Sequence, residues 1–88
     1  MSQTTKVEIY TWDHCPYCQK ALALLNAKGI EYSQIKLDGD EAAREEMSKN
    51  TIDNRKSVPQ IFLDGKNIGG CDDLHALEAS GELAQLIK

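Results

Sequence analysis

The 88-residue sequence has no long apolar run and no excess of positive charge. Residues 1–8 contain no uninterrupted apolar core, and no later stretch approaches the roughly 20 apolar residues that a helix needs to span a bilayer. The formal net charge is −4 and charges of both signs are interspersed, which leaves no basic stripe for nucleic acid and no polybasic patch for anionic lipid. We therefore expect a cytoplasmic protein with neither nucleic acid nor a membrane as its partner.

Cysteine is scarce as well, with three residues, and their odd number provides no disulfide framework. In a reducing compartment, a C-x-x-C pair indicates redox chemistry or metal binding in preference to a structural crosslink. A chain of 88 residues has room for one small domain with a modest core. We predict a single domain over residues 1–88, without a repeat, a linker or a low-complexity segment.

Two of the cysteines, Cys15 and Cys18, lie where a strand-like run meets a helix-like run. Pro16 between them suits the first position of a helix, where its missing N–H has no intrahelical partner to lose. Cys15 then falls at the N-cap, beside unpaired N–H groups and the positive end of the helix dipole, which favour a thiolate. We therefore predict that Cys15 is the nucleophile, and that Cys18, one turn further along, faces the protein and attacks a sulfur already bonded to Cys15.

Apolar periodicity and turn residues predict an alternating α/β chain with the element order βαβαββαα. Alternating, β-branched or aromatic stretches predict strands, which cover residues 7–12, 31–37, 57–63 and 66–68. Apolar residues at helical spacing predict helices, which cover residues 16–28, 41–50, 71–79 and 82–87. Residues 51–56 are polar and aperiodic, so we expect a loop there.

The connections between these elements predict how the strands pair. A strand, a helix and a second strand in succession predict that the first two strands lie parallel, joined by a right-handed crossover. Asp64-Gly65 between the last two strands is a strong signal for a two-residue hairpin. Gly29 is placed to end the first helix in a left-handed cap, and Asp38 or Asp40 to begin the second.

Three short motifs follow one another along the chain: Cys15-Pro16-Tyr17-Cys18 after the first strand, Val58-Pro59 at the third, and residues 68–73 at the last main helix. In this order and spacing they resemble the motifs of the glutaredoxins, specifically the small dithiol bacterial type, over nearly the whole chain. The resemblance implies an α/β, thioredoxin-like fold with a four-stranded mixed sheet flanked by helices. It also implies glutathione-dependent reduction of protein disulfides and of protein–glutathione mixed disulfides, by a monomer whose partners are glutathione and those proteins.

The resemblance further implies a role for each matched residue near the thiols. Cys15 matches the nucleophile, Cys18 the resolving thiol, and Tyr17 the ring that lies against bound glutathione. Pro59 matches the cis-proline of the family, which turns Val58 so that its N–H and C=O can pair with the cysteinyl part of glutathione like an added strand.

The last motif matches the site for the γ-glutamyl end of glutathione. Gly70, Cys71 and Asp72 would present backbone N–H groups to the γ-glutamyl carboxylate, an anion at a helix N-terminus. Asp72 or Asp73 would meet the γ-glutamyl ammonium. The chain departs from the family at Trp12, where many relatives carry lysine, and at Ser57, where they carry threonine.

The lysine that Trp12 replaces is the usual clamp on the glycyl carboxylate of glutathione. Three other cations, Lys49, Arg55 and Lys56, are candidates to replace it, and the sequence alone does not choose among them. Trp12 itself either provides a contact surface for a substrate protein or covers the end of the first strand.

Several alternatives concern the thiols and the histidines. Cys15 and Cys18 could bind zinc together with Cys71 and His75, in a C-x2-C…C-x3-H set. We expect no metal, because proline inside the pair and the helix start count against zinc, and the second cysteine counts against an iron–sulfur cluster bound through Cys15. Cys71 is either a third reactive thiol or a small, partly buried residue, and the second reading is the one we expect. His14 either adds positive charge beside Cys15 or is simply solvated, and His75 is expected to face solvent.

Two other functions remain compatible with the sequence. One is a non-catalytic carrier that binds a metal or an iron–sulfur cluster. The other is a thioredoxin-type reductant, fed by a flavoprotein reductase in place of glutathione, which would use the same dithiol. Charged groups for the two ends of glutathione discriminate between the glutathione-dependent enzyme and this reductant, and Asp72 and Asp73 are the candidates for one of those ends.

Overall fold

The computed structural model describes residues 3–52 and 54–88, and its elements follow the predicted order βαβαββαα. The strands are β1 (Val7–Thr11), β2 (Ser33–Lys36), β3 (Gln60–Leu63) and β4 (Lys66–Gly69). The helices are α1 (Pro16–Ala27), α2 (Glu41–Lys49), α3 (Cys71–Ser80) and α4 (Glu82–Leu86). None of the described helices is both long and apolar enough to cross a bilayer.

The main departure from the predicted boundaries is at β3. The sequence predicted a strand from Ser57, but the ladder begins only at Gln60. Pro59 has no N–H to donate to a neighbouring strand, so the ladder does not extend back through this residue. The Val58-Pro59 peptide bond is cis. This segment is therefore available to line a site.

The four strands form one mixed sheet in the order β2-β1-β3-β4. The first two strands are parallel, as the crossover prediction requires, whereas β3 is antiparallel to both β1 and β4. Asp64 and Gly65, which connect β3 to β4, have φ angles of 50° and 84°. The two-residue hairpin predicted from this dipeptide is therefore confirmed, and positive φ at both central residues is the mark of a type I′ turn.

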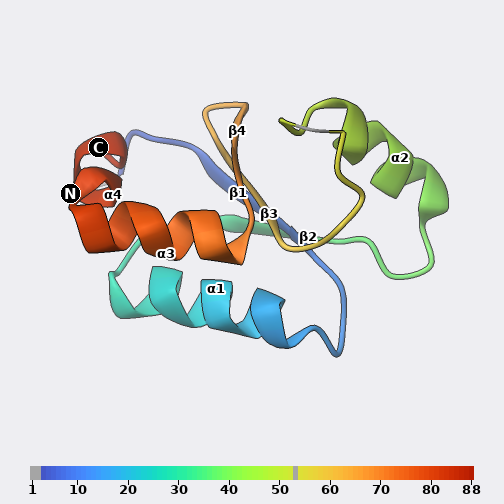
Figure 1. Cartoon of the computed structure of the whole chain (residues 1–88), viewed down its shortest axis with the longest axis horizontal. Coiled ribbons are helices and arrows are strands. Elements are labelled where there is room, and N and C mark those ends of the chain that lie inside the picture. The colour runs from blue at the N-terminus through green and yellow to red at the C-terminus, as the bar shows by residue number, and fades with distance from the viewer. Residues whose placement is uncertain (1–2, 53) are drawn as a thin grey trace.

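Helices cover both faces of the sheet, with α1 and α3 on one face and α2 on the other (Figure 1). The larger core cluster fills the space beneath α1, α3 and α4; its buried members are Val7, Ile9, Ala21, Leu25, Ile61, Leu63, Cys71, Leu74 and Leu83. A smaller cluster joins the opposite face to α2 through Leu37, Met47 and Phe62. All four residues of β3 are buried because this strand lies between two neighbours and under both layers.

The helix ends follow local signals in the sequence. Cys15 is the N-cap of α1 with Pro16 at the first helical position, and Gly29 just beyond the helix has φ 69°. Asp40 caps α2 by accepting a hydrogen bond from the Ala43 N–H at 3.0 Å. The starts of α1 and α2 are therefore well defined, and the start of α1 carries the two thiols of the C-x-x-C pair.

Candidate functional site

The two thiols of the C-x-x-C turn lie where the sequence predicted. The Cys18 N–H donates a hydrogen bond to the Cys15 Sγ at 3.4 Å, so the first turn of α1 points a backbone donor at the Cys15 sulfur. Cys15 is 8% exposed and Cys18 only 2%. All three cysteines of the chain are free thiols. Cys15 is thus the outer thiol of the pair and Cys18 the inner one.

The environment of Cys18 disfavours its thiolate. Burial, followed by the hydrogen bond with Cys15, raises the pKa of Cys18 to about 12, while a backbone hydrogen bond with Trp12 acts in the opposite direction. At neutral pH the Cys18 thiol is protonated and is a poor initial nucleophile. This asymmetry matches the predicted division between an attacking and a resolving thiol.

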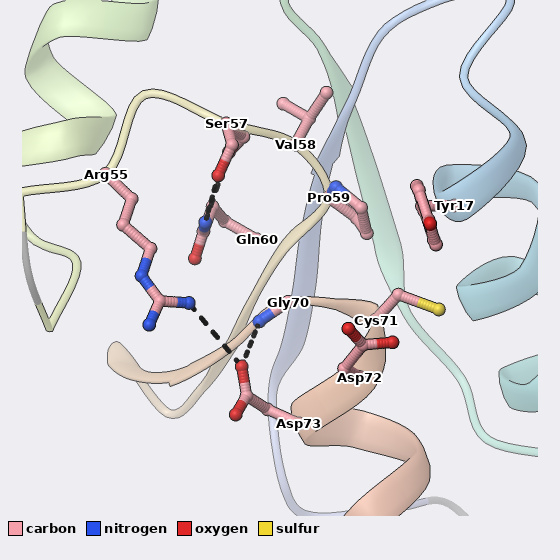
Figure 2. Close-up of a pocket in the computed structure, with 10 residues that line it drawn as sticks. All are labelled: Tyr17, Arg55, Ser57, Val58, Pro59, Gln60, Gly70, Cys71, Asp72 and Asp73. Atoms are coloured by element: carbon pink, nitrogen blue, oxygen red, sulfur yellow. Dashed lines mark hydrogen bonds and ion pairs between the residues drawn. The ribbon is translucent and has the colours of Figure 1, made fainter.

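Beside the thiols is an open pocket of about 170 Å³ (Figure 2). Its lining residues are Tyr17, Arg55, Ser57, Val58, Pro59, Gln60, Gly70, Cys71, Asp72 and Asp73. The seven residues that the resemblance assigned to glutathione are all among them. The Cys15 Sγ lies 3.8 Å from the Val58 carbonyl oxygen, so the outer thiol is at the edge of the pocket. Three motifs far apart in sequence thus meet around one hollow.

The start of α3 forms the acidic side of the pocket. Gly70 is the N-cap, and its N–H donates to the Asp73 Oδ2 at 3.0 Å, which is one half of a capping box. A Cβ at position 70 would lie 3.0 Å from the Pro59 carbonyl oxygen, so glycine permits this close approach. The same Asp73 oxygen lies 3.7 Å from a guanidinium nitrogen of Arg55, across the pocket (Figure 2).

Of the three cations proposed for the glycyl carboxylate, the structure brings Arg55 to the pocket. Lys49 pairs with Glu46 at 3.6 Å on α2, and Lys56 pairs with Glu45 at 2.6 Å. Neither lysine is among the residues that line the pocket. The geometry therefore favours Arg55 for this role.

Sequence reasoning missed a buried polar pair behind the pocket, Gln60 and Asn67, which are 1% and 9% exposed. The Asn67 Nδ2 donates to the Gln60 Oε1 at 3.2 Å, and the Gln60 Nε2 donates to the Ser57 carbonyl oxygen at 3.1 Å. Asn67 also accepts from the Ile52 N–H at 3.2 Å. The available signal was a glutamine inside an otherwise apolar strand, since a buried amide needs nearby partners.

Comparison with known proteins gives this pocket its context. The sequence matches the family model of the glutaredoxins over residues 7–68. It is 54% identical to glutaredoxin 3 of Escherichia coli K12 over 82 residues, which cover 93% of this chain and 96% of that protein. The chain belongs to the glutaredoxin family. As a member it is a glutathione-dependent thiol–disulfide oxidoreductase, as the motifs implied.

Solved glutaredoxin structures share the fold. The solution structure from Brucella melitensis matches with a TM-score of 0.80 at 44% identity, covering 92% of this chain and 86% of that one. The crystal structure of a buckwheat glutaredoxin–glutathione complex matches with a TM-score of 0.84 at 26% identity, covering 94% and 76%. The predicted thioredoxin-like fold, with its mixed four-stranded sheet, is thereby confirmed.

Of the remaining residues singled out from the sequence, Cys71 lines the pocket, whereas His14 and His75 are not among its lining residues. His14 is exposed with φ 61°, and His75 is exposed on α3. Cys71 is 5% exposed and belongs to the larger core cluster. Burial, with a smaller effect of Asp72, raises the pKa of the Cys71 thiol. Among the described residues, no group of three or more His, Cys, Asp or Glu side chains is arranged to hold a metal ion.

Proposed function

We propose that Cys15 and Cys18 carry out the oxidoreductase reaction and that the adjoining pocket binds glutathione. The observation that supports this proposal is the convergence of Tyr17, Val58-Pro59 and Gly70–Asp73 on one hollow whose edge is the outer thiol. The pocket is lined by one chain and does not need a second copy, so we propose that the protein acts as a monomer.

With a protein–glutathione mixed disulfide, the Cys15 thiolate attacks the glutathione sulfur. The protein leaves as a thiolate that takes up a proton, and Cys15 is left in a mixed disulfide with glutathione. A second glutathione thiolate then attacks the glutathione sulfur of that disulfide, which releases oxidised glutathione and restores the Cys15 thiolate. This route does not require Cys18.

With a protein disulfide, Cys15 attacks one sulfur and remains bonded to it. Cys18, which lies one turn away on α1, gives up its proton and attacks the Cys15 sulfur, so that the substrate leaves as a dithiol and a Cys15–Cys18 disulfide forms. Two glutathione molecules then reduce this disulfide. The raised pKa of Cys18 suits a thiol that reacts only after it is placed against an activated sulfur.

Each part of glutathione has a proposed partner in the pocket. The Val58 backbone pairs with the cysteinyl part, Tyr17 lies against the tripeptide, and Arg55 takes the glycyl carboxylate. Because the Gly70 N–H already donates to Asp73, the next N–H groups of α3, at Cys71 and Asp72, are the donors for the γ-glutamyl carboxylate. The carboxylates of Asp72 and Asp73 are the candidates for the ammonium.

We also propose a cytoplasmic location, where a reduced dithiol is maintained, and glutathionylated or disulfide-containing proteins as substrates. These proposals need separate tests, such as fractionation of the cell and size-exclusion chromatography of the purified protein.

A turnover assay with glutathione and a small mixed disulfide tests the function. We expect Cys15→Ser to abolish all activity, whereas Cys18→Ser keeps the removal of glutathione from the mixed disulfide and loses much of the reduction of protein disulfides. Comparable activity of the two variants on the mixed disulfide would contradict the assignment. Turnover with a flavoprotein reductase but not with glutathione would instead support the thioredoxin-type alternative.

A further inference from the structure

A cation from α2 lies over the ring of Trp12 at the end of β1. The Arg44 guanidinium carbon is 4.1 Å from the centroid of the Trp12 ring, well within the range of a cation–π contact. Both side chains are half-buried. This contact joins the segment between β1 and the dithiol turn to α2. Figure 1 shows α2 on the face of the sheet opposite α1 and α3.

The same guanidinium also holds the segment that leads into the pocket. The Arg44 Nε donates a hydrogen bond of 2.7 Å to the Lys56 carbonyl oxygen. The next two residues, Ser57 and Val58, line the pocket, and the Val58 carbonyl oxygen lies 3.8 Å from the Cys15 Sγ. Arg44 therefore holds the residue directly before Ser57 and Val58, the part of the pocket lining against which glutathione is proposed to bind.

The contacts of Trp12 complete a closed ring of interactions. The Trp12 backbone is hydrogen-bonded to the Cys18 thiol, and the Cys18 N–H donates to the Cys15 Sγ. From Cys15 the ring continues through the Val58 carbonyl to the segment that Arg44 holds. The stack of Arg44 on Trp12 thus spans the gap between the dithiol turn and residues 55–58.

We propose that Arg44 is a positioning residue: stacked on Trp12 and bonded to the Lys56 carbonyl, it sets the distance between the thiols and the Arg55–Val58 wall of the pocket. The inference rests on the proposed function, since it concerns the same glutathione site. Arg44 does not line the pocket, and it acts only through the two groups that it holds.

The guanidinium suits this position better than an ammonium. It is planar, so it can lie flat on an indole while its edge donates to a carbonyl, whereas lysine presents a compact, strongly hydrated charge. Arg44→Lys therefore keeps the charge but loses the combination of stacking and directed hydrogen bonding. Trp12→Phe keeps an aromatic face and weakens the cation–π contact.

The test measures the KM for glutathione and kcat for the wild type, Arg44→Ala, Arg44→Lys and Trp12→Phe. For Arg44→Ala we expect KM to rise by about threefold to tenfold with kcat within about twofold, because binding of glutathione depends on the wall while the thiols are intact. Arg44→Lys should recover less than half of the loss. Lys28→Ala is the control, because it removes one positive charge and the ion pair with Glu78 at the far end of α1, and it should leave KM unchanged.

A second readout uses fluorescence, since Trp12 is the single tryptophan of the chain. Loss of the guanidinium should expose the ring, so acrylamide should quench Trp12 more strongly in Arg44→Ala than in Lys28→Ala. A residue that only stabilises the fold would lower the melting temperature and leave KM unchanged at 25 °C. If Arg44→Ala fails to fold, Arg44→Lys carries the kinetic test.

The outcomes separate this inference from the function on which it rests. If the wild type saturates with glutathione and Arg44→Ala and Arg44→Lys saturate at the same concentration, the inference alone is overturned. If the wild type shows no glutathione-dependent turnover, the proposed function is contradicted, and the positioning role that rests on it is contradicted as well.

Discussion

The two walls of the pocket are built in different ways. One wall, here called the helix wall, consists of the first turns of α1 and α3, with Cys15–Cys18 and Gly70–Asp73. The other, the loop wall, consists of residues 54–59, between α2 and β3. They face each other across the hollow, where Arg55 approaches Asp73 (Figure 2).

The bonds that shape the helix wall are local. Cys18 donates to Cys15 and Gly70 donates to Asp73, and in both cases the partners are three residues apart. Hydrogen bonds of this kind belong to helix starts and depend little on the rest of the fold. A helix wall with local bonds is therefore expected to tolerate changes elsewhere in the protein.

The loop wall depends on partners from other elements. The Lys56 carbonyl is held by Arg44, which is twelve residues away. The Ser57 carbonyl has a local partner, Gln60, but Gln60 is itself held by Asn67 on the next strand. These partners lie on α2, β3 and β4. The comparison shows that one half of the site is a property of local sequence and the other half is a property of packing.

The largest expected effect concerns the two thiols of the helix wall. In a Cys15→Ser variant, Cys18 should react with iodoacetamide at pH 8 about a hundredfold or more slowly than in the same variant unfolded in guanidinium, because burial, the main cause of its raised pKa of about 12, persists. Peptide mapping by mass spectrometry separates Cys18 from Cys71. Equal rates in the folded and unfolded protein would show that the inner thiol is not protected.

The same shift has a consequence for stability. The unfolded chain loses the Cys18 proton near the ordinary cysteine pKa of about 8.5, whereas the folded protein retains it up to about 12. The free energy of unfolding should therefore decline as pH rises through this window. Cys18→Ser should remove this part of the decline, and Cys71, whose thiol remains in both proteins, provides the background.

The next effect concerns the acidic side of the helix wall. Asp72→Asn and Asp73→Asn are assayed separately. We expect at least one of them to weaken the apparent affinity for glutathione by about tenfold, which is the cost of losing a charge-assisted hydrogen bond. Asparagine at position 73 keeps an acceptor for the Gly70 N–H, so the change isolates the charge. Glu82→Gln, at the start of α4, is the control for one lost negative charge.

If neither Asp72→Asn nor Asp73→Asn alters the dependence on glutathione concentration, the γ-glutamyl site lies elsewhere. The thioredoxin-type alternative would then gain support, because that function needs no acidic partner for the ammonium.

The loop wall is tested by Asn67→Ala. This change removes the donor to Gln60 and the acceptor for the Ile52 N–H, and it leaves the buried Gln60 Oε1 without this bond. We expect a loss of about 1–3 kcal/mol in the free energy of unfolding, together with a higher KM for glutathione, because Gln60 holds Ser57. Denaturation in urea and the turnover assay measure the two effects. An unchanged KM in a folded variant would show that the loop wall does not depend on the buried pair.

A further change tests the comparison at the junction between β4 and α3. Gly69 has φ 105°, and a Cβ there would overlap the Asp73 carboxylate. Gly69→Ala should displace Asp73 from the Gly70 N–H and cost about 1–3 kcal/mol of stability through backbone strain and loss of the cap. Gly39→Ala is the matched control, since Gly39 has φ 71° but nothing within 4 Å of an added Cβ.

For Gly69→Ala the decisive measurement is the affinity for glutathione. It should weaken in Gly69→Ala and stay unchanged in Gly39→Ala, although both variants carry a strained alanine. Equal affinities would mean that the placement of Asp73 has no part in binding.

The sequence by itself determined the element order and the helix wall. Strand alternation, helical spacing, Pro16 after Cys15, the Asp64-Gly65 hairpin and the acidic start of α3 are local signals. The structure contains the elements in the predicted order, and the main departure is the later start of β3. Such features depend on neighbours within a few residues, so a linear pattern is enough to predict them.

Only the tertiary structure decided the loop wall. Residues 51–56 have no periodicity, and the choice of Arg55 over Lys49 and Lys56, the stack of Arg44 on Trp12, and the buried pair of Gln60 and Asn67 were not predicted. Each of these contacts joins side chains from different elements. Their partners are set by how α2, β3 and β4 pack, because a long side chain on a loop can reach many groups and only the packed fold selects one of them.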